Sequence, residues 1–67
     1  MINTPEQLNQ AIEQMGRMQR ILESYKEAIL AKNPRNFAIF ASGPLEQIRQ
    51  LQAQIDEYVH HLEQTPA

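Results

Sequence analysis

Apolar residues in the first half of the chain repeat every seven positions, and a second apolar residue follows three positions after most of them. On an α-helix these side chains form one continuous stripe, made of Leu8, Ala11, Met15, Met18, Leu22, Tyr25 and Ile29. Ile12 and Ile21 lie on its flanks and make it broader than one neighbouring helix covers. The pattern therefore predicts a long helix over about residues 5–32.

The ends of this helix carry start and stop signals. Thr4 fits the N-cap, Pro5 the first helical position, and Gln7 the third position of a capping box. Pro34 disfavours helical geometry at the preceding residue, so the helix is expected to end near Lys32. Gly16 interrupts its interior, either as tolerated sequence drift or because another helix crosses closely there.

A second helical pattern fills the C-terminal part of the chain. Its apolar residues are spaced alternately by three and four and are widened by Leu45 and Val59; they are Ile48, Leu51, Ile55, Tyr58 and Leu62. A break is expected at Ser42-Gly43-Pro44, with Pro44 in the first turn of a new helix. These signals predict a helix over about residues 44–64, ended by Thr65-Pro66-Ala67.

The segment between the two patterns is ambiguous. Residues 37–42 fit a strand, or a short helical segment begun by Asn33 and Pro34, and we favour the helical form. Phe37 and Phe40 either plug the end of a helical bundle or form an exposed patch that receives a partner.

Together these elements predict an all-α fold, an antiparallel helical hairpin forming a single domain over residues 1–67. Both stripes are too wide for one partner, so we expect a homodimer or larger assembly, arranged as a four-helix bundle. Gln19 and Gln52 on the flanks are either solvated boundary residues or amides that fix register. The predicted interface consists of Leu8, Ile12, Met15, Met18, Leu22, Tyr25, Ile29, Ile48, Leu51, Ile55, Tyr58 and Leu62.

Composition and charge narrow the range of functions expected of this chain. The 67 residues contain no cysteine, which excludes disulfides, thiolate zinc sites and cysteine nucleophiles. The net charge of −2 is unlike that of a nucleic-acid binder. The longest apolar run is too short to span a membrane, and the N-terminus lacks the pattern of a signal peptide, so a cytoplasmic location is expected.

Candidate chemistry is limited to one cluster near the C-terminus. His60 and His61 each follow a carboxylate by one helical turn, Asp56 and Glu57 respectively. Such a pair offers two metal ligands, whereas a protein zinc site needs three or four, and no third ligand is evident. Surface helix residues are the favoured interpretation, and metal binding is the alternative. We expect no enzyme activity and no cofactor.

The predicted plan resembles the ROP-like class of small antiparallel helical pairs that dimerise into four-helix bundles. This resemblance concerns architecture alone, and by analogy it adds RNA binding as an alternative function. Residues 44–58 also resemble the closing part of some short bacterial antitoxin-associated proteins, through Pro44-Leu45, Gln47-Ile48, Leu51, Gln54-Ile55 and Glu57-Tyr58. That resemblance implies binding of a partner protein; no helix-turn-helix follows these residues, so DNA binding is not expected.

Overall fold

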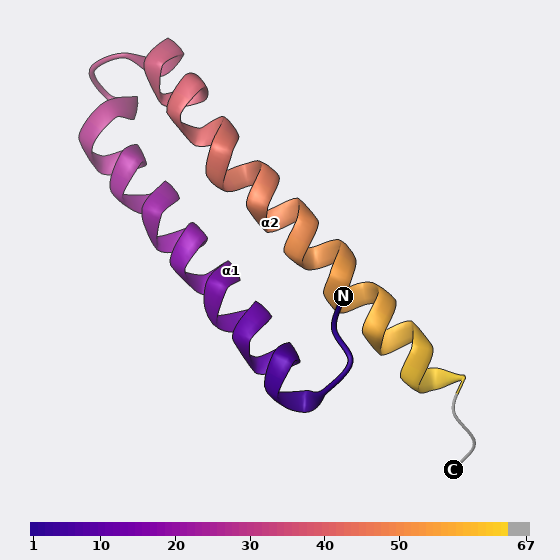
Figure 1. Cartoon of the computed structure of the whole chain (residues 1–67). Coiled ribbons are helices and arrows are strands. Elements are labelled where there is room, and N and C mark those ends of the chain that lie inside the picture. Colours follow the sequence, from indigo (N-terminus) through magenta and orange to yellow (C-terminus); the bar gives the residue numbers. More distant parts are fainter. Residues whose placement is uncertain (65–67) are drawn as a thin grey trace.

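The computed structural model describes residues 1–64 and shows two antiparallel helices joined by a short turn (Figure 1). Helix α1 spans Pro5–Tyr25 and continues into a π-helical segment, η1, over Lys26–Leu30. Helix α2 spans Pro34–Glu63. The prediction of an all-α hairpin is thus confirmed. The predicted stop at residues 65–67 lies outside the described residues.

The start of α1 is capped as the sequence predicts. The Thr4 hydroxyl oxygen accepts a hydrogen bond from the backbone N–H of Gln7 at 3.1 Å. The Gln7 side chain reaches back one residue further than in the usual capping box, and its Oε1 accepts from the N–H of Asn3 at 2.7 Å. This second bond fixes the direction in which the N-terminal segment leaves the helix.

The turn between the helices is built around Asn33. This residue is extended, with φ −154° and ψ 91°, and its Oδ1 accepts a hydrogen bond from the N–H of Asn36 at 3.1 Å. Asn33 is therefore the N-cap of α2, and Pro34 occupies the first helical position. The helical interpretation of residues 37–42 is confirmed.

The predicted break at residues 42–44 is wrong, because α2 continues through Pro44 as a helix of 30 residues. Two features make this tolerable. Gly43 has no Cβ to clash with the following proline ring. Ala41 and Pro44 also face α1, at 2% exposed and half-buried respectively, so the apolar stripe of α2 extends back to Phe37. Packing of this longer stripe offsets the hydrogen bond that proline cannot donate, and α2 becomes longer than the 21-residue α1.

The best-buried cluster lies toward the open end of the hairpin, away from the turn. There the N-terminal segment doubles back from the start of α1 toward α2 (Figure 1). This places Ile2, 8% exposed, in one cluster with Ala11 and Leu51. The partly buried side chains packed against this cluster are Leu8, Met15, Ile55 and Tyr58. Ile2 lies outside both periodic patterns, so its burial is not predicted by the sequence.

Candidate interaction surface

The two long faces of the hairpin can be told apart by their glutamines. Gln10 and Gln14 of α1 line one hollow together with Gln54 of α2. Met1 and Ile2 line the same hollow, so the N-terminal segment lies over this side. We call it the covered face.

The opposite face carries exposed apolar side chains. Ile12 is two residues from both Gln10 and Gln14, and Gln52 is two residues from Gln54; on an α-helix two residues correspond to a rotation of about 200°. Both therefore point away from the covered face. Leu45 and Val59 lie seven residues before and after Gln52 and share its side of α2.

We call this second surface the open face, and define it by Ile12, Gln19, Leu45, Gln52 and Val59. Its three aliphatic side chains, Ile12, Leu45 and Val59, are 48%, 45% and 42% exposed. Aliphatic residues at this exposure that share one side of a rod are typical of helix-packing surfaces.

The predicted interface residues divide into three groups by burial. Leu51 is buried between the helices, whereas Ile12 and Leu62 are exposed. The remaining predicted residues are half-buried; they are Leu8, Met15, Met18, Leu22, Tyr25, Ile29, Ile48, Ile55 and Tyr58. Most of the stripe is thus shared between packing inside the hairpin and contact with solvent.

The turn end of the hairpin holds the two phenylalanines. Phe37 is half-buried, and Phe40 is exposed but lies against Tyr25 of α1, with ring centroids 5.9 Å apart. The neighbouring Ile39 is 64% exposed. The Phe40 ring thus packs on α1, and Ile39 beside it faces solvent. Binding of a partner at this end stays a prediction.

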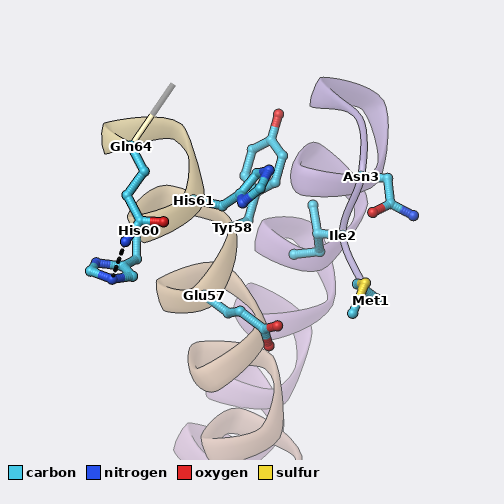
Figure 2. A pocket seen from close by; sticks show the side chains of 8 residues that line it. All are labelled: Met1, Ile2, Asn3, Glu57, Tyr58, His60, His61 and Gln64. Carbon is cyan, nitrogen blue, oxygen red and sulfur yellow. Dashed lines mark hydrogen bonds between the residues drawn. The ribbon is translucent and has the colours of Figure 1, made fainter. Parts of the chain in front are cut away.

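The histidines lie at the other end, beside the N-terminal segment. A cavity of about 390 Å³ separates that segment from the last turns of α2 (Figure 2). In Figure 2, Ile2 points across it toward α2, where the side chains of Tyr58 and His61 lie. The lining residues are Met1, Ile2, Asn3, Glu57, Tyr58, His60, His61 and Gln64.

Each member of the first carboxylate–imidazole pair, Asp56 and His60, has a hydrogen-bond partner outside the pair. Asp56 Oδ1 accepts a hydrogen bond from Gln52 Nε2 at 2.9 Å, one turn toward the N-terminus. His60 Nε2 lies 3.1 Å from Gln64 Nε2, one turn toward the C-terminus. Within residues 1–64 no group of three or more histidine, aspartate or glutamate side chains is placed to hold a metal ion.

Two further findings bear on the class of protein. Neither described helix has both the length and the apolar character that a membrane crossing requires. The fold is a two-helix, all-α hairpin, which agrees with the ROP-like resemblance only at the level of architecture. No protein-family model, curated protein or solved structure matches this chain.

Proposed function

We propose that this protein is a non-enzymatic helical hairpin that self-associates and serves as an interaction or regulatory module. The observation that carries the proposal is the small core of the single chain. Among residues 1–64 only Ile2, Ala11, Ala41 and Leu51 are buried, and two of these are alanines. The larger apolar side chains of both stripes keep part of their surface in water.

The energetics favour association. A chain of this size buries a modest share of its surface and commonly needs a disulfide, a metal or a second chain for stability. Cysteine is absent from the sequence. Covering a half-exposed leucine or isoleucine contributes on the order of 1 kcal/mol, and two helix pairs packed together cover many such side chains at once. A homodimer built as a four-helix bundle is the simplest assembly of this kind.

Light scattering on a sizing column tests the proposal. We expect a mass of at least twice 7.8 kDa at micromolar concentration, and loss of helicity or thermal resistance on dilution. A folded monomer that keeps its full helicity at all concentrations would contradict self-association.

A second candidate function is docking of another protein at the turn end, as the antitoxin-like resemblance suggests. The exposure of Ile39 and Phe40 in neighbouring positions favours it. The test is co-purification of one stoichiometric partner with the wild-type chain but not with Ile39→Ser/Phe40→Ser. Retention of the partner by that variant, or absence of any partner, would count against this candidate.

A further inference from the structure

We infer that two copies of the chain associate through the open face, with Ile12 of α1 and Leu45 and Val59 of α2 at the contact. This inference rests on the proposed self-association and adds which surface is used.

The first reason is that the N-terminal segment already occupies the other side. Met1 and Ile2 lie over the covered face, where Ile2 is buried against Ala11 and Leu51. A second hairpin could reach the helix pair there only by displacing this segment and exposing Ile2 to water. Within residues 1–64 no such segment lies over Ile12 or Val59, which are 48% and 42% exposed. Association through the open face therefore needs no rearrangement of the chain.

The second reason is charge. Two copies carry the same net charge of −2, so a surface that meets its own image must avoid placing like charges together. The five residues that define the open face are uncharged, whereas Glu23, Asp56 and Glu63 follow Gln19, Gln52 and Val59 by one helical turn on the same side. The two copies must therefore be arranged so that these carboxylates do not meet. Gln52 also keeps a hydrogen-bond partner within its own chain, because its amide donates to Asp56. If Gln52 becomes buried between two copies, its amide therefore keeps this hydrogen bond.

The third reason is shape. Residues 45, 52 and 59 repeat every seven positions, which is the spacing of helices that pack almost parallel along their length. The molecule is a rod of 53 × 17 × 15 Å with an accessible surface of 5319 Å², so one of its four long faces offers at most on the order of 1,200 Å², against about 800 Å² per partner in a stable interface. A rod of the same length matches this footprint, and a second copy provides one.

The first test changes the open face and compares it with a matched control. The variant Ile12→Gln/Leu45→Gln replaces two exposed aliphatic side chains of the open face. The control Ile39→Gln makes the same kind of change at the 64% exposed residue two positions before buried Ala41, which turns it to the far side of α2. Sedimentation equilibrium should show dimerisation at least about 100-fold weaker in the double variant and within about twofold of wild type in the control.

The second test does not depend on breaking the interface. Because the chain has no cysteine, Gln52→Cys and Ile39→Cys each introduce a single thiol. We expect the thiol at position 52 to react with a disulfide reagent at least about tenfold more slowly above the dimerisation concentration than below it. The thiol at position 39 should react equally fast at both concentrations. Circular dichroism of each variant establishes that the helices are retained.

The outcomes separate the two proposals. If the wild type associates but the double variant does so equally tightly, and position 52 is not protected, the open-face assignment is overturned while self-association stands. If the wild type stays a folded monomer, self-association itself is overturned. If the thiol at position 52 is protected only when a different protein is added, that protein occupies the open face, and the inference of a second copy is overturned.

Discussion

The rings of Tyr25 and Phe40 lie with their centroids 5.9 Å apart and their planes tilted by 52°. Tyr25 is the last residue of α1, and Phe40 lies in the second turn of α2. This tilted geometry is one that aromatic pairs prefer, because the edge of one ring meets the face of the other. The pair joins the two helices next to their connecting turn, beyond the reach of the cluster around Ile2.

We predict that Phe40→Ala lowers the free energy of unfolding by about 1 to 2 kcal/mol although the side chain is half exposed. A double-mutant cycle with Tyr25→Ala should give a coupling of about 0.5 to 1.5 kcal/mol. Urea unfolding followed by circular dichroism, at one fixed protein concentration, measures both values. Tyr25→Phe keeps the ring and should change stability by less than about 0.5 kcal/mol. A coupling of zero would mean that the rings do not interact in solution.

Ile2 should contribute to stability although it precedes both helices. We predict that Ile2→Ala costs about 2 kcal/mol, because its side chain is buried between Ala11 and Leu51 and the truncation leaves a cavity. Thermal unfolding provides the measurement. The matched control is Ile39→Ala, the same truncation at an exposed site, with an expected change within about 0.5 kcal/mol. Equal effects of the two truncations would show that the N-terminal segment does not pack on α2.

Pro44 should be a point of weakness inside α2. We predict that Pro44→Ala raises the free energy of unfolding by about 1 to 3 kcal/mol, because it restores the backbone hydrogen bond to the Phe40 carbonyl and removes the ring clash. Chemical unfolding monitored by helicity measures the gain. Unchanged or reduced stability would indicate that residues 42–44 form a break rather than continuous helix.

The two glycines, Gly16 in α1 and Gly43 in α2, offer a paired test of the role of Gly43 before the proline. A Cβ added at Gly16 would meet only Arg20 Nη1 at 3.7 Å, and one at Gly43 would meet nothing beyond its chain neighbours. Gly16→Ala should therefore stabilise the protein by about 1 kcal/mol. Gly43→Ala should give clearly less, or a loss, because its Cβ faces the ring of Pro44. An equal gain at both sites would contradict the role we assign to Gly43, and a loss at Gly16 would place another helix against it.

Asn33 is predicted to hold the start of α2. Asn33→Ala removes the acceptor for the N–H of Asn36 and should cost about 1 kcal/mol, whereas Asn33→Ser keeps a side-chain oxygen and should cost less. Urea titrations of both variants under identical conditions test the difference. If alanine and serine behave alike, the side chain does not cap the helix.

Much of the hairpin could be predicted because its signals are local or periodic. Thr4 and Gln7 are close in sequence, so their capping bonds follow from residue type and spacing alone. The repeat from Leu8 to Ile29 likewise requires only the helical period. The candidate metal residues and the predicted interface were inferred from the same helical spacing. Metal binding and self-association stay predictions, and the experiments above address self-association.

Features that depend on contacts between residues distant in sequence could not be predicted from local signals. Gly43-Pro44 is a strong local stop signal, and only the packing of Ala41 and Pro44 against α1 reveals that the helix passes through it. No local sequence signal predicts the π-helical segment η1. The exposure of Ile12 and Val59 depends on which face the N-terminal segment covers, and that choice involves residues more than 50 positions apart in sequence.

The sequence by itself determined that this chain forms two amphipathic helices and where the first of them begins, because backbone capping and helical periodicity act over a few residues. The tertiary structure alone decided how far α2 extends, where Ile2 is buried and which face stays open. These outcomes depend on apolar surface shared between segments far apart in the chain, and burial of that surface outweighs the local preference of a glycine–proline pair.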